Sequence, residues 1–325
     1  MRTVLKLGLR GLCLAGALTS AAACLAQGGG DAGIVLIAAP ELNRIVPASA
    51  RVEKVASGFT FTEGPVWRGG TLLFSDIPNN VIQQYDPATG RVTPYRQPSG
   101  NTNGSTLDSR GRLICCEHSG RRVSRQEADG SYTTLVDQYE GKRLNSPNDV
   151  VIKRNGALYF TDPPYGLGRQ DEDPNKELPH NGVYRLHNGK LTLLTTELTR
   201  PNGLAFSPDE KFLYVANSDS ARKIWMRYPV RRDGTLGPGT VFADVTSNTE
   251  DGAPDGMKVD REGNVFATGP GGVWIFSPEG KHLGTIKPAE VPANCGWGGA
   301  DGQTLYMTAR SGLYRIRTGT GGELP

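Results

Sequence analysis

A repeated pattern of short hairpins restricts the fold of this sequence more than any other feature. Six phrases of small and polar residues each precede an apolar strand, a tight turn and a second strand. The phrases begin at Glu63, Asn103, Pro147, Pro201, Pro254 and Cys295. Their spacing of roughly 40 to 55 residues is that of the four-stranded blades of a β-propeller. The repeat therefore predicts an all-β, six-bladed propeller.

The turns between the strands agree with this prediction. The strand at 157–160 follows Asn155-Gly156, and the strand at 304–307 follows Asp301-Gly302. The chain contains 43 Gly and 22 Pro, which is normal for a β protein with many tight turns and high for a helical one. Helical periodicity is almost absent after residue 50.

The two ends of the propeller are predicted to meet in the sixth blade. After the strand Gly312–Ile316, too little chain remains for an outer strand. The segment Arg51–Val55 has the pattern of a strand, and we expect it to complete the sixth blade and close the ring. Residues 51–325 are therefore expected to form a single propeller domain. Residues 27–50, which are Gly-rich or weakly patterned, are expected to form an N-terminal arm.

The first 26 residues have the pattern of a secretory signal peptide. Three basic residues precede an apolar run, and small residues follow it. Cleavage after Ala26 predicts a secreted or periplasmic protein. Alternatively, Ala-Ala-Ala-Cys at 21–24 is a loose lipobox, which would attach a lipid anchor to Cys24. No later run reaches the roughly 18 apolar residues that span a bilayer.

Charge and cysteine content exclude several classes of function. Lys+Arg is 36 and Asp+Glu is 33, and the resulting net charge of +3 argues against a nucleic-acid binder or another charged macromolecular partner. Outside the signal peptide the cysteines are Cys115, Cys116 and Cys295. An odd number with two adjacent members argues against a disulfide framework, so we expect buried thiols. No cysteine pair has a zinc-binding spacing.

Four oxygen-bearing residues occupy matching positions in four of the phrases: Glu63, Asn148, Asn202 and Asp255. In a propeller the innermost strand of each blade lines the channel and its first residues lie at one mouth, so these side chains should converge there. Two carboxylates and two amide carbonyls form an all-oxygen site of net charge −2, which suits Ca²⁺. Zinc would require His or Cys, and the four histidines have no metal-binding spacing.

Two simpler interpretations of these residues remain open. Asn before Gly and Pro-Asp-Gly are ordinary turn sequences, although four of them at equivalent repeat positions favour a shared site. A cation that plugs the ring for structural reasons would use the same ligands. It would differ from a catalytic cation only in lacking an open coordination position that faces solvent.

Longer motifs surround the same residues. They are Glu-Gly-Pro-Val-Trp at 63–67, Leu-Asn-Ser-Pro-Asn-Asp-Val-Val at 144–151, Phe-Thr-Asp-Pro-Pro-Tyr-Gly at 160–166, Pro-Asn-Gly-Leu at 201–204 and Pro-Asp-Gly-Met at 254–257. Together they resemble the gluconolactonase branch of the family that groups senescence marker protein, gluconolactonase and luciferin-regenerating enzyme. The resemblance covers about residues 50–317.

This resemblance implies a six-bladed propeller that holds one divalent cation and hydrolyses sugar lactones or related esters. The family's metal positions match Glu63, Asn148, Asn202 and Asp255. Ca²⁺, or another cation such as Zn²⁺, Mn²⁺ or Mg²⁺, would polarise the lactone carbonyl and orient a water. We assign Asp255 as the general base and Glu63 as the anchoring ligand. The sequence has no G-x-S-x-G nucleophile elbow.

Six further residues are candidate substrate contacts: Asn103, His118, Arg143, Asp162, Tyr165 and Trp297. Animal members of the family hold the sugar with an Arg and an Asn near the third phrase, but the residue two before Asn148 is Ser146. Arg143, Asn145 or Asp162 would therefore have to serve. Asn103 is expected to line the channel without ligating. Blade packing is the alternative role for the aromatic residues, and a satisfied structural histidine is the alternative for His118.

The polar loop 166–180 is expected to be either a lid or a surface excursion. Two other functions also remain open. One is a different metal-dependent esterase, acting on phosphotriesters or acyl-homoserine lactones, whose pocket walls should be apolar. The other is a non-catalytic propeller that binds a sugar or a protein on the same face. The expected partner of the enzyme is a small-molecule lactone.

Overall fold

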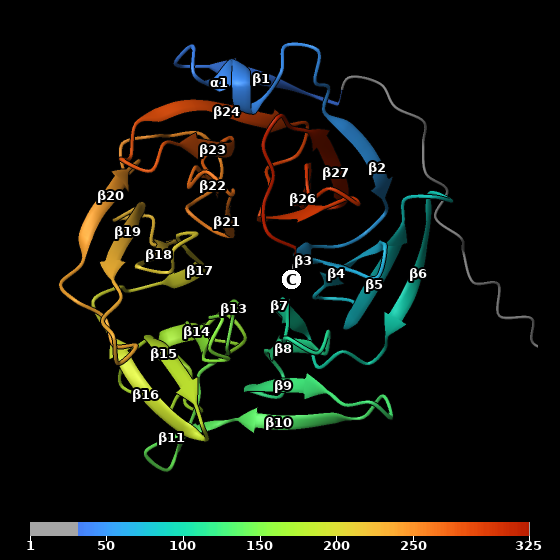
Figure 1. Cartoon of the computed structure of the whole chain (residues 1–325). Helices are drawn as coiled ribbons and strands as arrows, with labels where there is room; N and C mark the ends of the chain where they lie inside the picture. The colour runs from blue at the N-terminus through green and yellow to red at the C-terminus, as the bar shows by residue number, and fades with distance from the viewer. Residues whose placement is uncertain (1–31, 325) are drawn as a thin grey trace, which may run out of the picture.

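The computed structural model describes residues 32–324, which form a ring of six antiparallel sheets (Figure 1). Each sheet is one blade, and its strands follow each other outward from the centre in chain order, except for β1 and β2. The all-β, six-bladed propeller that the repeat predicts is therefore confirmed.

The strands of the first three blades run from the inside outward. They are β3 (Thr62–Arg68), β4 (Thr71–Asp76), β5 (Val81–Asp86) and β6 (Arg91–Arg96); β7 (Thr102–Leu107), β8 (Leu113–Glu117), β9 (Arg122–Gln126) and β10 (Tyr132–Val136); and β13 (Val150–Ile152), β14 (Leu158–Asp162), β15 (Gly182–His187) and β16 (Lys190–Thr195). A separate two-stranded sheet connects the second blade to the third. It consists of β11 (Gln138–Tyr139) and β12 (Lys142–Arg143).

The last three blades follow the same order. They are β17 (Pro201–Phe206), β18 (Phe212–Asn217), β19 (Ile224–Pro229) and β20 (Thr240–Asp244); β21 (Met257–Val259), β22 (Val265–Gly269), β23 (Gly272–Phe276) and β24 (His282–Pro288); and β25 (Asn294–Gly298), β26 (Thr304–Ala309) and β27 (Gly312–Arg317).

The sixth blade is completed by the beginning of the propeller. Strand β2 (Glu53–Ser57) pairs antiparallel with β27, as the pattern at Arg51–Val55 predicts. The stretch expected to form an arm contains a further strand, β1 (Gly33–Ile37), which pairs with β24 as a fifth strand of the fifth blade. A short helix, α1 (Leu42–Ile45), follows it and buries both of its terminal side chains. The signal peptide that the sequence predicts lies outside the described residues.

Apolar side chains fill the spaces between neighbouring blades. Trp225 of the fourth blade, for example, packs against Trp274 and Phe276 of the fifth, with ring centroids 6.2 and 5.3 Å apart. The cysteines at 115, 116 and 295 are buried and unpaired, as expected. Burial raises the pKa of Cys115 to about 11 and that of Cys295 to about 12, so these thiols remain protonated.

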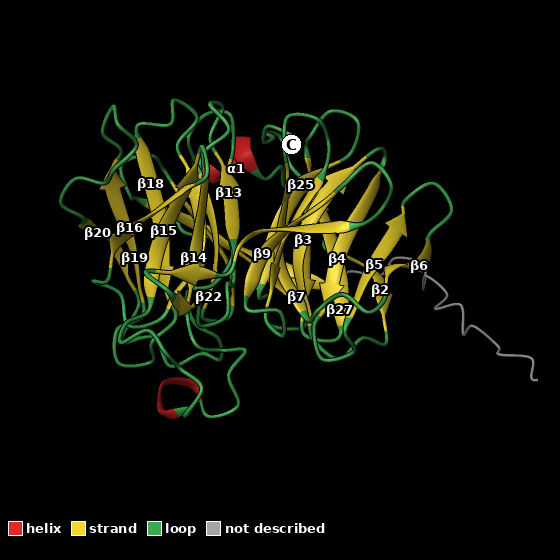
Figure 2. Ribbon diagram, turned by 90° about the horizontal axis from the view of Figure 1, so that it is seen from below, coloured by secondary structure: helices red, strands yellow, loops and turns green. Residues whose placement is uncertain are grey.

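The two faces of the ring carry different extra segments. The loop between β14 and β15 contains a single 3₁₀ turn, η1 (Gln170–Glu172), which projects from the lower face in Figure 2. The C-terminus lies over the opposite face, close to the centre of the ring in Figure 1. Within residues 32–324, no helix has the length and apolar character needed to cross a membrane.

Candidate functional site

The innermost strands begin with polar residues that form a closed ring of contacts at one mouth of the channel. A glycine follows the polar residue in four of the blades: Gly64, Gly104, Gly203 and Gly256. A Cβ atom on any of the four would come within 2.6 Å of an atom of the next blade's polar head. Glycine at these positions therefore allows the heads of successive blades to approach one another closely.

Hydroxyl groups of the second strands strengthen this ring. Ser75 donates to the carbonyl of Asn103, Thr161 to that of Asn202, and Thr268 to that of Ala293, at 2.7–2.8 Å. Each of these hydrogen bonds joins one blade to the head of the next. Bonds from buried donors hold the heads in fixed positions, so the site is built on the rigid part of the fold.

Glu63 and Asp255 are the two predicted carboxylate ligands. Glu63 is 2% exposed, and its Oε2 accepts hydrogen bonds from Gly64 N at 2.6 Å and Asn294 Nδ2 at 2.9 Å. Burial, followed by the charge of Asp149, raises the pKa of Glu63 to about 7. Burial and the charges of Glu63 and Asp149 raise the pKa of Asp255 well above its ordinary value. Asp255 Oδ1 is buried and has no hydrogen-bond partner within the described residues.

Asn148 and Asn202 are the two predicted amide ligands, and both are buried. Asn202 donates its amide nitrogen to Ser218 Oγ at 2.9 Å, which leaves the carbonyl oxygen of its side chain available. Ser218 in turn donates to the Pro254 carbonyl, next to Asp255. Asn148 is 3% exposed, and its backbone is fixed by bonds to Gly104 and Thr161. In Asn202 the hydrogen bond to Ser218 thus occupies the amide nitrogen and leaves the amide oxygen free.

The donor set fits a hard cation. The mutual repulsion of buried carboxylates raises their pKa values, and a divalent cation among them would relieve that repulsion. Within residues 32–324, no three His, Cys, Asp or Glu side chains gather closely enough to hold a metal ion by themselves. The predicted site is of a different kind, because half of its ligands are asparagines.

His118 and Asn103 lie together beside this mouth. His118 is 7% exposed, and its Nε2 lies 3.4 Å from Asn103 Nδ2. Burial lowers the pKa of His118 to about 4, so the neutral imidazole accepts this hydrogen bond. The side-chain oxygen of Asn103 is then left buried and without a partner in the described part of the chain.

Tyr165 extends from the third blade toward the fourth and fifth. Burial, followed by the charge of Asp255, raises the pKa of Tyr165 to about 12, and the Ser218 hydroxyl also interacts with it. The phenol therefore keeps its proton and can act as a hydrogen-bond donor beside Asp255. The adjacent Gly166 lies against His118 and Ser146, since a Cβ there would be 2.7 Å from the Cβ of each.

Asp162, a predicted substrate contact, uses its carboxylate within the fold. Its two carboxylate oxygens accept the backbone N–H groups of Asn145 and Ser146, each at 2.8 Å. It is completely buried, and burial raises its pKa to about 7. Asp162 therefore fixes the segment that leads to Asn148. Asn145 is used in a similar way, because its amide nitrogen donates to Asp162 O and His180 O.

Arg143 and the loop 166–180 form part of the rim. Arg143 is exposed, and its backbone N–H donates to Glu177 Oε2 at 2.7 Å. The loop is held by Asp171, which accepts a hydrogen bond from Asn181 at 3.0 Å and pairs with Arg200. These contacts attach the loop to the neighbouring residues of the rim, so it is not a free surface loop.

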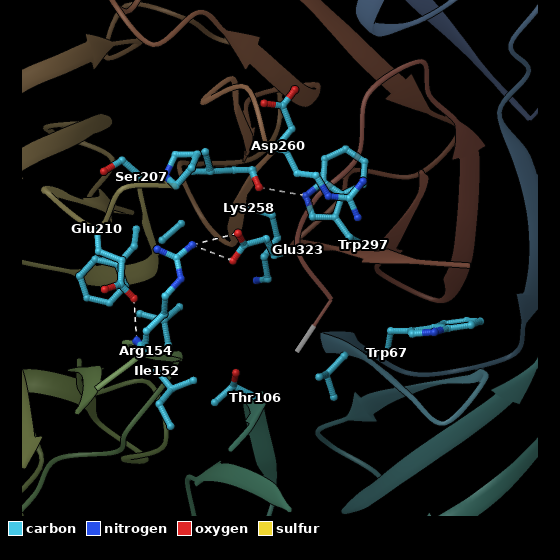
Figure 3. Close-up of a pocket in the computed structure, with 17 residues that line it drawn as sticks. Trp67, Thr106, Ile152, Arg154, Ser207, Glu210, Lys258, Asp260, Trp297 and Glu323 are labelled. Carbon is cyan, nitrogen blue, oxygen red and sulfur yellow. Dashed lines mark hydrogen bonds and ion pairs between the residues drawn. The ribbon is translucent and has the colours of Figure 1, made fainter. Parts of the chain in front are cut away.

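Trp297, a predicted substrate contact, lies toward the other end of the channel from the polar heads. The sixth blade presents Asn294, not Cys295 or Trp297, at the head position. Trp297 is three residues further along β25, which is about 10 Å. There it lines a cavity of about 220 Å³ together with Lys258, Arg154 and the C-terminal segment (Figure 3).

The sequence analysis missed three residues of the site. Asn294 was not predicted, because the sixth phrase lacks the Asn-Gly or Asp-Gly sequence that marks other heads. Asp149 lies within the motif at 144–151 and was given no role, although it stands where four other blades have glycine. Ser218 lies after a strand end and carries no motif. The register of the repeat would have identified the first two.

Comparisons with known proteins agree with the fold. Residues 61–311 match the family described as SMP-30/Gluconolactonase/LRE-like region. A gluconolactonase of Zymomonas mobilis is 40% identical over 307 residues, covering 87% of this chain and 85% of the relative. A 6-deoxy-6-sulfogluconolactonase of Pseudomonas putida is 35% identical, covering 76% of this chain and 82% of the relative.

Solved structures give the same result. The structure of a gluconolactonase from Xanthomonas campestris superimposes with a TM-score of 0.82 at 34% identity, covering 90% of this chain and 98% of that one. The matched region includes all the heads of the inner strands described above. The chain therefore belongs to the SMP-30/gluconolactonase/luciferin-regenerating enzyme-like family.

Proposed function

We propose that this protein is a hydrolase that opens a sugar lactone with the help of one divalent cation. Relatives named gluconolactonase and 6-deoxy-6-sulfogluconolactonase support a lactone as the substrate class. The proposal depends most on one observation: the ring of oxygen donors at one mouth includes a buried carboxylate oxygen of Asp255 that has no partner in the described residues.

The cation site that we propose consists of Glu63, Asn148, Asn202 and Asp255. Hard oxygen donors favour Ca²⁺, while Zn²⁺, Mn²⁺ and Mg²⁺ are the alternatives that a titration must compare. A bound cation would supply Lewis acidity, polarising the lactone carbonyl and making a water more acidic. Glu63 anchors the site, since Asn294 and Gly64 fix one of its oxygens and leave the other for the cation.

Asp255 is the proposed general base. Its free oxygen accepts a proton from the water as the water oxygen attacks the carbonyl carbon. The ring C–O bond then breaks, and the same proton passes to the departing ring oxygen, so that lactone and water yield one hydroxy acid. A neighbouring cation would keep Asp255 ionised despite its burial, because an opposite charge lowers the pKa of a carboxyl group.

Tyr165, Asn103 and His118 are the proposed substrate contacts at this mouth. Tyr165 can donate a hydrogen bond, because the raised pKa keeps its phenol protonated. Asn103 can accept one through its unpartnered oxygen, and His118 fixes the orientation of that amide. A donor and an acceptor at the same mouth suit a ligand that is rich in hydroxyl groups.

We also propose that the protein is exported. The proposal is based on the leader pattern of residues 1–26, which lie outside the described residues. Lipid attachment at Cys24 is the alternative to simple cleavage. Cell fractionation followed by N-terminal sequencing of the mature protein distinguishes the two.

The experiment that tests the function measures hydrolysis of a panel of sugar lactones, aryl esters and phosphotriesters by chelator-treated protein, with and without added Ca²⁺. We expect activity on sugar lactones that is lost with chelator and restored by cation. Asp255→Asn should abolish turnover while the far-ultraviolet circular dichroism remains unchanged. Asp260→Asn, at the other end of β21, is the control and should retain activity. Activity that survives both chelation and Asp255→Asn would contradict the proposal.

A further inference from the structure

Two blades lack a glycine after the polar head, the third with Asp149 and the sixth with Cys295, and only Asp149 carries a charge. Gly64, Gly104, Gly203 and Gly256 follow the polar heads of four blades, but in the third blade the residue after Asn148 is Asp149. The absence of a side chain at Gly104 makes room for the carboxylate, because a Cβ there would be 2.4 Å from Asp149 Oδ1. The ring thus accommodates a third carboxylate next to Glu63 and Asp255.

Asp149 is poorly compensated by its own surroundings. It is 2% exposed, and its Oδ1 accepts a hydrogen bond from Val150 N at 2.9 Å. Its Oδ2 is buried and has no hydrogen-bond partner in the described part of the chain. A buried carboxylate oxygen without a partner is costly, so a nearby positive charge is expected to balance it.

A positively charged side chain, that of Lys258, lies in the channel. Lys258, on β21, is half-buried in the channel, and its Nζ donates to the Met257 carbonyl at 3.0 Å. The attraction between its ammonium and the Asp149 carboxylate opposes the cost of burying that carboxylate. The three carboxylates of Glu63, Asp149 and Asp255 together with one ammonium leave a net charge of −2. That residual charge matches one divalent cation.

We propose that Asp149 is a positioning residue for the cation site, an outer carboxylate that strengthens the binding of a divalent cation without ligating it, with Lys258 as its opposing charge. This inference rests on the proposed function, because it assumes a cation among the four heads. Outer groups of this kind typically change metal affinity by about 10- to 100-fold. Asp149 and Lys258 thereby set the charge of cation that the site accepts.

Calcium titration of chelator-treated protein by isothermal calorimetry tests the inference. Asp149→Asn keeps the shape of the side chain and removes its charge, and should weaken Ca²⁺ binding by about 10- to 100-fold. Lys258→Met keeps the unbranched stem and should tighten binding by about threefold or more. Asp260→Asn is the matched control: Asp260 is also a buried carboxylate, but it lies at the other mouth and bonds Asn264, so calcium affinity should not change.

Thermal unfolding separates a positioning role from a merely structural one. Without cation, Asp149→Asn should have a Tm equal to or above that of the wild type, because the variant no longer buries an uncompensated charge. With saturating Ca²⁺, its increase in Tm should be smaller than that of the wild type. A structural role would instead lower both Tm values and leave the calcium-induced increase unchanged, which would overturn the inference.

The outcomes also distinguish this inference from the proposed function. Wild-type protein that binds no divalent cation would overturn both. Wild-type protein that binds Ca²⁺ while Asp149→Asn binds it equally well would overturn this inference alone. Should Asp149→Asn fail to fold, Lys258→Met still decides: tighter calcium binding supports the inference, and unchanged or weaker binding overturns it.

Discussion

Replacing His118 by Gln should reduce the loss of stability that the protein suffers on acidification. The imidazole is 7% exposed, and burial lowers its pKa from 6.5 to about 4. In the unfolded chain the same side chain takes up a proton below about pH 6.5, whereas in the folded protein it stays neutral until about pH 4. The unfolded state therefore binds more protons across this range, and the free energy of unfolding falls as the pH falls.

The size of this effect follows from the shift in pKa. Each pKa unit corresponds to about 1.4 kcal/mol, so a shift from 6.5 to about 4 predicts a loss of about 3 kcal/mol between pH 7.5 and pH 4. Gln cannot be protonated, and its carbonyl oxygen can still accept the hydrogen bond from Asn103. The packing cost of the substitution is independent of pH and cancels when the two pH profiles are compared.

Urea denaturation at several pH values between 7.5 and 4 measures the difference. The free energy of unfolding of the wild type minus that of His118→Gln should decrease by about 3 kcal/mol as the pH falls from 7.5 to 4. His187→Gln is the control, because His187 lies on β15 in the outer part of the third blade. If the pH profiles of wild type and His118→Gln run parallel, the claim that His118 stays neutral in the fold and accepts a hydrogen bond from Asn103 is refuted.

Three further substitutions test packing, backbone hydrogen bonding and the choice of mouth. Gly256→Ala would place a Cβ 1.9 Å from Asn294 Cγ, and it should lower the free energy of unfolding by about 1–3 kcal/mol and weaken calcium binding. Gly237→Ala, whose Cβ would have its nearest neighbour at 3.3 Å, is the control and should do neither. Equal urea denaturation profiles of the two variants would contradict this prediction. Asp162→Ala removes the acceptor of two backbone N–H groups and should cost at least about 2 kcal/mol, with an unchanged Tm as the contrary result. Glu323→Ala breaks an exposed ion pair at the other mouth and should cost less than about 1 kcal/mol without changing lactone hydrolysis, so a large loss of activity would place the site at the wrong mouth.

The fold was predictable from the sequence because the repeat is local. Each blade carries its own turns and its own polar head, and the strand at Arg51–Val55 has no other partner than the incomplete sixth blade. Strand β1 was not predictable in the same way. Its five residues, Gly33–Ile37, form no hairpin with a neighbouring segment, and they pair only with β24, about 250 residues later in the chain.

Site residues that share a position in the repeat were predictable from the sequence. Residues whose role depends on contacts that form only in the folded chain were not. Asp162 has the residue type of a ligand, but its carboxylate is used by two backbone N–H groups that only the folded segment brings near. The sixth phrase was aligned on Cys295, one residue after the head that the structure shows at Asn294. Within an inner strand, such an error in alignment moves a side chain toward the other mouth or into the space between the blades.

The most direct test of the account is a crystal structure of protein soaked in Mn²⁺, with the cation located by its anomalous scattering. We predict a single strong peak at the head ring, within bonding distance of Glu63, Asn148, Asn202 and Asp255, and no such peak in crystals of Asp255→Asn. No peak among these four side chains, or a peak whose ligands lie at the mouth that contains Trp297, would contradict it.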